Sequence, residues 1–360
     1  MSAGEHRPLR FWLLALAATL ASLWLLSGML LPFVLGIAIA YLLDPIVDRC
    51  ARLGLPRWAG TLLALCGFAV GIAGTVVLLV PLSKVQLLRL ADRLPMLVER
   101  VRDEMVPALL GLVDRLRPED VERLRSAATE YAGVVVLWIG SFLTGLLSRG
   151  FAILDVVSVL VITPVVAFYL LRDWDLIVST VDGWLPRRNA DLIRAEVREV
   201  DRTLAGFVRG QSAVCVILGA YYAVVLTLVG LDFGLSIGVV VGVLSIIPYF
   251  GSAVGLLASV SLAIAQYDSW TMVGVVAGLF LFGQFIEGNF VTPRLVGGSV
   301  GLHPVWVMFA LLAGGYLFGF LGVLVAVPVA AVVGVGTRFA LRQYLGSAYF
   351  RGRGADGPGG

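Results

Sequence analysis

The chain has 360 residues, of which 59% are hydrophobic and 14% charged, and its mean hydropathy is +0.95. A soluble globular domain carries roughly a quarter charged residues, so this composition excludes a soluble domain and predicts a polytopic membrane protein. The formal net charge of +3 is small, and we expect the lipid bilayer and a small polar solute or ion as partners, with no nucleic acid.

Apolar runs near the N-terminal end predict membrane helices, which we place at 11–82. The runs at 11–31 and 58–82 each reach the ~20 residues that cross a bilayer core, and a shorter run at 33–43 follows a proline. A cleaved signal peptide is the alternative for 11–31, but that run is too long for a signal and further spans follow it.

The next segment, 83–130, carries charges of both signs and leucines spaced three or four residues apart. This pattern predicts an amphipathic helical segment outside the membrane. Pro95 and Pro107 are expected to bend or break its helices. Two interpretations stay open, namely a solvated bundle or surface-lying helix, and a domain that binds a partner or forms oligomers.

Residues 131–345 are predicted to form the membrane transport core, and 346–360 a disordered tail. Apolar runs at 151–171 and 206–230 are each long enough to span a bilayer. Because all the predicted spans are helical, we expect an all-α fold.

Two longer apolar segments, 233–265 and 304–336, do not fit a single span. As one helix, each would be roughly 50 Å long at ~1.5 Å per residue, which exceeds a bilayer core of about 30 Å and is short for two full spans. Prolines and glycines lie inside both. We therefore expect discontinuous or re-entrant helices, with non-helical backbone near 247–251 and 319–322.

The two segments also resemble one another, which indicates a weak internal repeat. Aligning them places Gly251 on Gly322 and Gly255 on Ala326. Glycine and proline interruptions at matching places in a transporter point to its binding site, because irregular backbone at membrane depth lines a cavity or is buried in protein. Ordinary close packing of helices through small residues is the alternative.

Two motifs for catalysis are missing from the sequence. Lys84 is the single lysine and follows a serine, so no phosphate-binding G-x-x-x-x-G-K-[ST] loop exists. His6 and His303 have no partners at metal-ligand spacing, and no H-E-x-x-H is present. We therefore predict no enzyme, no cofactor and no metal site, which leaves a secondary carrier, a channel or a membrane scaffold.

Polar residues next to apolar runs are the candidates for function, because charge at membrane depth is costly. They are Arg209 and Gln211, Asp155, Asp173 and Asp175, and the stretch QFIEGNFVTPRL, which supplies Gln284, Glu287, Asn289, Thr292 and Arg294. An ion pair between Glu287 and Arg294 is one interpretation of that stretch. Contact with a ligand, or a role in gating, is the other.

Several blocks together resemble the autoinducer-2 exporter family of bacterial permeases, also called PerM-like. They are LPFVLGIAIAYLLDPIVD, TPVVAFYLLRDWDLI, FVRGQ, LSIIPYFGSAVG and the long block from 286 to 333 that begins IEGNFVTPRLVGG. The resemblance covers about residues 11–345. It implies an inner-membrane permease of about eight helices that assembles as a homo-oligomer, with a pentamer suggested, and it defines the fold better than the substrate.

The resemblance leaves two functions open, and a third is weaker. One is export of a small polar metabolite such as the autoinducer-2 signal by alternating access, and the alternative is a monovalent cation/proton antiporter. A scaffold acting through 83–130 is the third. An antiporter needs a carboxylate at membrane depth, where the chain offers only Asp155 and Glu287, and this scarcity favours the exporter.

The candidate substrate-binding or gating residues combine the polar positions with the predicted breaks. The full set is Arg209, Gln211, Pro248, Tyr249, Gly251, Gln284, Glu287, Asn289, Thr292, Arg294, Gly319 and Gly322.

Arginine in short loops predicts that both termini are cytoplasmic. The 44–57 loop, the 172–205 segment and the C-terminal tail are rich in arginine, whereas 83–130 balances its basic residues with acids and long loops cross regardless of charge.

This topology predicts the labelling of single cysteines introduced at 103 and 188 in a chain without native cysteines. A maleimide that cannot cross the membrane, added to intact cells, should label Asp103→Cys and leave Arg188→Cys unlabelled until the cells are opened. The reverse pattern would contradict the topology.

Overall fold

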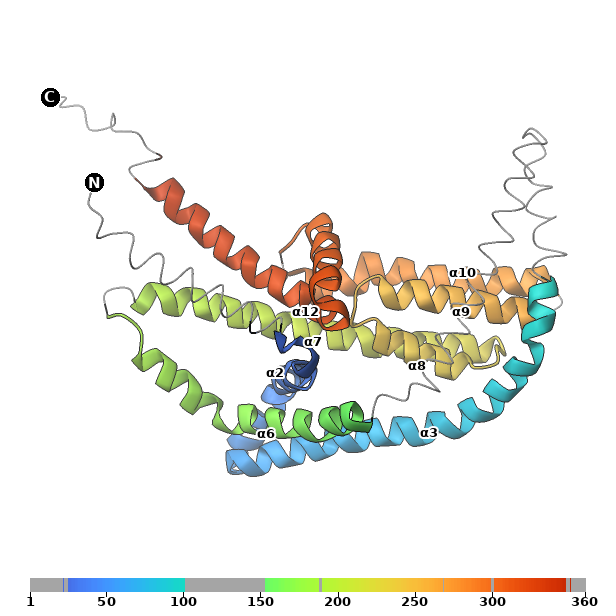
Figure 1. Ribbon diagram of the computed structural model, residues 1–360, viewed down its shortest axis with the longest axis horizontal. Coiled ribbons are helices and arrows are strands. Elements are labelled where there is room, and N and C mark those ends of the chain that lie inside the picture. The colour runs from blue at the N-terminus through green and yellow to red at the C-terminus, as the bar shows by residue number, and fades with distance from the viewer. Residues whose placement is uncertain are drawn as a thin grey trace. The chain divides into compact units, whose positions relative to one another are not determined.

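A computed structural model describes residues 25–100, 153–187, 190–267, 269–298 and 301–347, with isolated residues 22 and 350 (Figure 1). At 80–100 and 153–158 it describes the backbone alone. Four expectations lie outside the described residues: the apolar run at 11–31 apart from its last few positions, the extramembrane segment beyond residue 100, the side chain of Asp155, and most of the tail at 346–360.

The all-α prediction is confirmed, since the described residues form helices and no strand. The α-helices are α2 (Leu31–Arg52), α3 (Arg57–Arg100), α6 (Ile153–Gly183), α7 (Ala190–Leu228), α8 (Gly234–Leu244), α9 (Phe250–Gln266), α10 (Trp270–Ile286) and α12 (Pro304–Gly346). Short 3₁₀ and π turns are η1 (Ser27–Met29), η3 (Glu287–Val291) and η4 (Pro293–Gly297).

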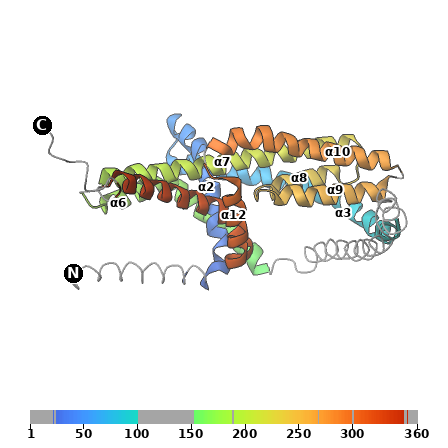
Figure 2. The ribbon, with the colours of Figure 1, turned by 90° about the horizontal axis from the view of Figure 1, so that it is seen from above.

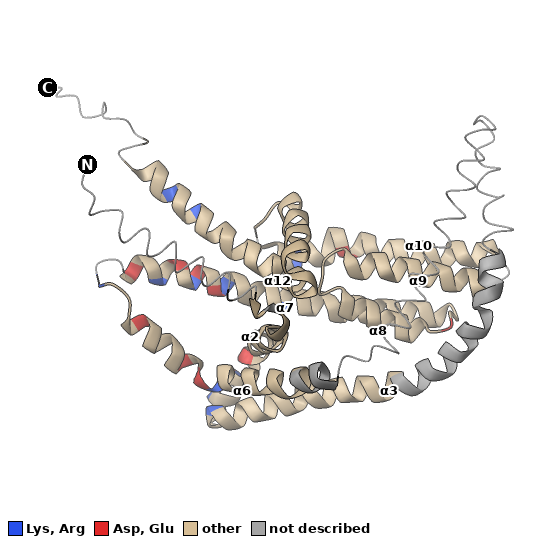
Figure 3. Cartoon of the chain, in the orientation of Figure 1, with Lys and Arg blue, Asp and Glu red and all other residues tan. Residues whose placement is uncertain are grey.

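Five stretches of helix among the described residues are long and apolar enough to cross a membrane, which confirms a polytopic membrane protein. They are Leu31–Arg52, Arg57–Leu79, Ala190–Leu228, Trp270–Gly297 and Pro304–Gly346. The predicted short run at 33–43 is thus part of a full-length helix. α8, α9 and α10 contain no Lys, Arg, Asp or Glu (Figure 3).

Of the bend or break expected at Pro95, the break is absent. The helix α3 continues through Pro95, because a proline removes one hydrogen bond of the ladder while the neighbouring turns keep theirs. The domain boundary predicted at 82/83 therefore falls inside a continuous helix, and the four-part domain division stays a prediction.

The described helices fall into two compact units. Unit 1 holds α2, the start of α3, α6 from Ser158, α7 up to Val214, and the chain from Gly288 through η4 and α12. Unit 2 holds the rest of α3, α7 from Cys215, α8, α9 and α10.

The predicted break in 233–265 is confirmed in unit 2. α8 ends at Leu244, α9 begins at Phe250, and the residues between them turn, with Tyr249 in the left-handed region at φ 68°. α9 packs against both α8 and α10 (Figures 1 and 2). Because α8 has 11 residues and α9 has 17, each is shorter than the ~20 residues that span a bilayer core.

The second predicted break is confirmed inside α12, in unit 1. Gly319 has φ 59° and ψ −140°, a conformation that only glycine adopts readily. The arms on either side, 304–318 and 320–346, contact each other through small residues. Gly314 and Gly322 lie so close that a Cβ on Gly314 would be 2.5 Å from the carbonyl oxygen of Gly322. Both broken segments therefore join two apolar arms at a tight turn.

Within unit 2, α7 and α8 approach at backbone distance. A Cβ on Gly238 would lie 2.0 Å from the backbone nitrogen of Ala223, and one on Gly242 would lie 2.6 Å from the Cα of Gly219. Such contacts replace the hydrophobic effect as a source of helix association inside lipid, since they maximise van der Waals packing.

We predict that Gly238→Ala destabilises the protein by about 1–3 kcal/mol, because the added methyl group meets the α7 backbone. Gly274→Ala is the matched control: a Cβ there would meet no atom within 4 Å, and alanine is the better helix former by about 1 kcal/mol. Thermal unfolding in detergent should give a lower midpoint for the first variant and an unchanged or higher one for the second. Equal midpoints would contradict the close contact.

Candidate functional site

An apolar core joins α2, α3 and α6 in unit 1 and positions a cluster of charges at one end of these helices. Ala40, Leu43, Val47, Ala64 and Leu171 are buried together. The core brings the first turn of α3 next to the second half of α2 and the middle of α6, where all three helices turn polar.

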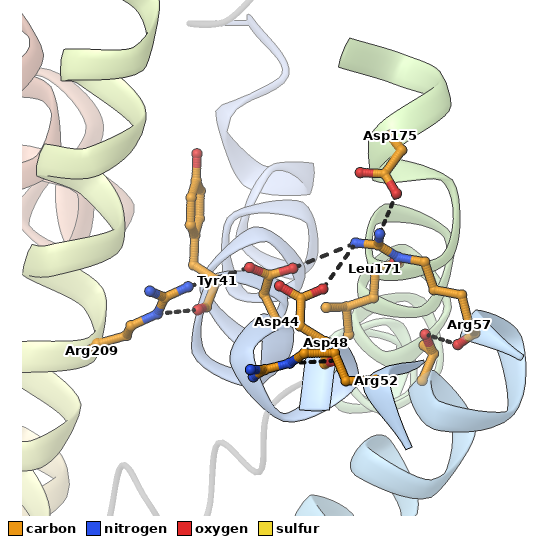
Figure 4. A network of polar contacts seen from close by, with 9 residues as sticks. Tyr41, Asp44, Asp48, Arg52, Arg57, Leu171, Asp175 and Arg209 are labelled. Carbon is orange, nitrogen blue, oxygen red and sulfur yellow. Dashed lines mark hydrogen bonds and ion pairs between the residues drawn. The ribbon is translucent and has the colours of Figure 1, made fainter. Parts of the chain in front are cut away.

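Arg57, at the start of α3, is the centre of this charged network (Figure 4). Its guanidinium group pairs with Asp175 on α6 and donates to the Leu171 carbonyl at 3.1 Å. It also lies 3.7 Å from carboxylate oxygens of both Asp44 and Asp48 on α2.

Asp44 links this network to α7. Arg209 lies 3.3 Å from the second Asp44 oxygen and donates to the Tyr41 carbonyl at 3.1 Å (Figure 4). The Tyr41 hydroxyl in turn donates to Asp201 at 3.0 Å. Two guanidinium groups and four carboxylates therefore tie α2, α3, α6 and α7 together.

The network is partly solvated, because the Asp175 side chain is 76% exposed whereas Asp44 and Arg57 are 30% and 26% exposed. The arginine-rich segments 44–57 and 172–205, which we predicted to lie on the same side of the membrane, both belong to unit 1. Beyond the network, Arg194 donates to both oxygens of Asp182 at 2.6 and 2.9 Å and thereby lowers the pKa of that carboxyl.

Arg209 and Gln211 lie beside the stretch 292–297, as part of unit 1. Between them is Gly210, where a Cβ would lie only 2.2 Å from the Leu295 carbonyl oxygen, so α7 packs directly on the backbone of η4. Gln211 is buried, with 6% of its surface exposed, and is engaged in an interaction of its own.

The stretch 284–295 is the end of α10 followed by two π-helical turns, η3 and η4. π-Helical turns are rare and occur frequently at functional sites. Asn289 is exposed on η3 and Thr292 lies at the junction of the two turns.

In unit 2 the same stretch carries a chain of hydrogen bonds to α7. Gln284 Nε2 donates to the Tyr222 hydroxyl at 3.0 Å and to Glu287 Oε2 at 2.7 Å. Tyr222 donates to the Phe280 carbonyl at 3.2 Å and is fully buried. Glu287 therefore has a neutral donor as its partner at the end of an apolar helix.

The interpretation that Glu287 pairs with Arg294 was wrong. The two are not among the ion pairs of the described residues, and the Arg294 guanidinium lies over the Phe290 ring at 5.5 Å. Seven residues make about two turns of an α-helix, which would place both side chains on one face. The wider π-helix makes only about one and a half turns over that length, so the side chains leave on different sides.

The remaining candidates, Pro248, Tyr249, Gly251, Gly319 and Gly322, form the two breaks. The predicted residues divide between the two units. Unit 2 holds Pro248, Tyr249, Gly251, Gln284 and Glu287, and unit 1 holds Arg209, Gln211, Asn289, Thr292, Arg294, Gly319 and Gly322.

Several polar residues of the network and the hydrogen-bond chain were missed by sequence reasoning: Tyr41, Asp44, Asp48, Arg57, Asp201 and Tyr222. Asp175 was a candidate because it closes an apolar run. The only local signal was the spacing of Asp44 and Asp48, which places two acids one helical turn apart. In the described part of the chain, no group of three or more His, Cys, Asp or Glu side chains is placed to hold a metal ion.

Apolar helices long enough to span a membrane, together with two discontinuous helices, define the class, a polytopic α-helical membrane protein. The model of the AI-2E family transporter matches residues 13–340, and the chain belongs to this family. It is 31% identical over 323 residues to YrrI of Bacillus subtilis (strain 168), named as a transport protein, with 87% of each chain covered.

Two further relatives have names of the same kind. PerM of Escherichia coli (strain K12), named as a permease, is 27% identical over 89% of this chain and 90% of its own. MT0215 of Mycobacterium tuberculosis (strain CDC 1551 / Oshkosh), named as a transport protein, is 29% identical over 89% and 86%. The family and these names identify a membrane transporter rather than an enzyme.

Asp44→Asn is expected to destabilise the protein by about 1–2 kcal/mol, because it removes the carboxylate that two partly buried guanidinium groups share. The control is Asp173→Asn in α6, since Asp173 is as exposed as Asp44 but pairs with its sequence neighbour Arg172, and the change should cost at most about 0.5 kcal/mol. Thermal unfolding of both variants in detergent tests this. Adding Arg209→Gln to Asp44→Asn should cost less than the sum of the two single changes, and strict additivity would contradict a direct link.

Proposed function

We propose that the protein exports a small polar metabolite, such as the autoinducer-2 signal, by alternating access. The description of the family supports this reading, and so does the chain Tyr222–Gln284–Glu287, which offers polar groups to a solute inside an otherwise apolar part of unit 2. The family's description and the reported names of relatives mention no ion, so they do not favour a cation/proton antiporter.

The two broken helices are the parts that we propose to move. Discontinuous helices in transporters supply both a binding site and a hinge. Gly319 and the turn 245–249 are the points where the backbone leaves the helical conformation. Of the candidate residues in unit 2, we propose contact with the solute for Gln284 and Glu287 and a gating role for Pro248, Tyr249 and Gly251. For the candidates in unit 1 we propose a gating role.

The surroundings of the protein are also part of the proposal. We propose an inner-membrane location with both termini cytoplasmic, a helical extramembrane segment at 83–130, and assembly as a homo-oligomer, with a pentamer expected. The first arm of α12 carries large apolar side chains that are mostly exposed in the single chain, such as Phe309, Leu312 and Tyr316. Lipid or a neighbouring subunit would cover them.

Transport by purified protein in liposomes tests the proposal. Liposomes loaded with autoinducer-2 should release it faster with the protein than without it. Parallel liposomes with imposed sodium, potassium and proton gradients test the antiporter. Ion exchange without solute release would overturn the exporter.

In the same assay, Glu287→Gln is expected to lower the initial rate at least tenfold while changing the unfolding free energy by less than about 0.5 kcal/mol. The amide can still accept from Gln284, and no cation is left unpaired, because Arg294 lies over Phe290. Adding Arg294→Gln should restore nothing. Poor folding of the single variant that the double variant repairs would contradict the prediction.

A further inference from the structure

The hydrogen bonds around Tyr222 determine which way the Gln284 amide faces. Tyr222 has one hydroxyl hydrogen and gives it to the Phe280 carbonyl, so its oxygen can only accept from Gln284. An ionised Glu287 carboxylate also only accepts. The Gln284 atom that lies 3.0 Å from the Tyr222 hydroxyl oxygen and 2.7 Å from Glu287 Oε2 is therefore the amide nitrogen.

Both hydrogens of that nitrogen are used inside the protein. Among the described residues, no protein donor reaches the amide oxygen of Gln284 or the second oxygen of Glu287. Both side chains are half-buried. The side chains of Gln284 and Glu287 therefore offer a bound molecule two hydrogen-bond acceptors and no donor.

Tyr222 is held rigidly enough to maintain this orientation. Its ring stacks on Phe280 with centroids 4.2 Å apart and planes 16° from parallel. On the other side the α10 backbone is pressed against it, since a Cβ on Gly283 would lie 2.8 Å from the Tyr222 hydroxyl oxygen. A polar group fixed by packing can hold a neighbouring side chain in one orientation.

We propose that Tyr222 is a positioning residue that sets the selectivity of the transported solute. By holding the Gln284 amide nitrogen away from the solute, it leaves two acceptors that bind the hydroxyl groups of a neutral polyhydroxylated molecule. The same acceptors repel a carboxylate or a phosphate, because neither offers a hydrogen and both carry negative charge. This inference rests on the proposed function.

Tyr222→Phe tests the proposal, because phenylalanine keeps the ring stack and removes the oxygen. The Gln284 amide can then rotate and present its N–H groups to a solute. Tyr221→Phe is the matched control. The Tyr221 hydroxyl donates to the Leu279 carbonyl at 3.0 Å and takes no part in the hydrogen bonds that link Tyr222, Gln284 and Glu287.

Binding is measured with ribose as the neutral probe and ribose 5-phosphate as the anionic one. In the unmodified protein the ratio of the two affinities should favour ribose. That ratio should fall at least tenfold in Tyr222→Phe and stay within twofold in Tyr221→Phe. An unchanged ratio in Tyr222→Phe, or an equal change in both variants, would overturn the proposal.

A second measurement needs no solute. The infrared band of the Glu287 carboxylate, isolated by subtracting the spectrum of Glu287→Gln, should shift in Tyr222→Phe and not in Tyr221→Phe. No shift overturns the positioning role even if transport is demonstrated. A shift in a protein that binds neither probe supports the positioning role and overturns the assignment to polyols, which separates this inference from the proposed function.

Discussion

Every backbone N–H and C=O group inside a bilayer needs a partner from the protein, because hydrocarbon supplies none. The break between α8 and α9 meets this requirement with tight turns, in which Ile246 and Ile247 donate to carbonyls three residues earlier at 3.2 and 3.1 Å. Pro248 follows, and a proline has no N–H to satisfy. At the end of α9, Gln266 donates to the Gly230 carbonyl and accepts from the Asp232 nitrogen. The turn between α8 and α9 is thus stabilised by local backbone hydrogen bonds.

The positions of the charged residues also reflect the free-energy cost of placing polar groups in hydrocarbon. Unpaired charge in hydrocarbon is expensive, and the described charges of unit 1 cluster where α2, α3 and α6 end their apolar runs, with solvent within reach of Asp175. Unit 2 is different, because α8, α9 and α10 carry no charged residue and Glu287 follows directly on α10. There the Glu287 carboxylate accepts a hydrogen bond from the Gln284 amide rather than pairing with a cation, and the same amide also donates to Tyr222.

Much of the fold could be predicted because its causes are local. Each apolar segment is too long for one span of a bilayer and contains proline or glycine. These two facts were enough to locate the turn near Pro248 and the break at Gly319. The site was predicted less well. Arg57 and Asp175 are separated by 118 residues, and Arg209 and Asp44 by 165, so no spacing in the sequence links them. The Glu287–Arg294 pairing failed for another reason, since it assumed an α-helix where the backbone forms π-helical turns.

Adjacent residues of α7 connect the pieces of unit 1. Arg209 is held by Asp44 and by the Tyr41 carbonyl on α2, and Gly210 lies against the Leu295 carbonyl of η4. A rotation of α7 by one residue, about 100°, would break the Arg209 contacts and drive a side chain into the η4 backbone at the same time. α2 and η4 are therefore coupled through α7, because packed contacts have discrete arrangements rather than continuous ones. A change in the geometry of η4 would therefore alter the packing at Gly210 and, through α7, the contacts of Arg209.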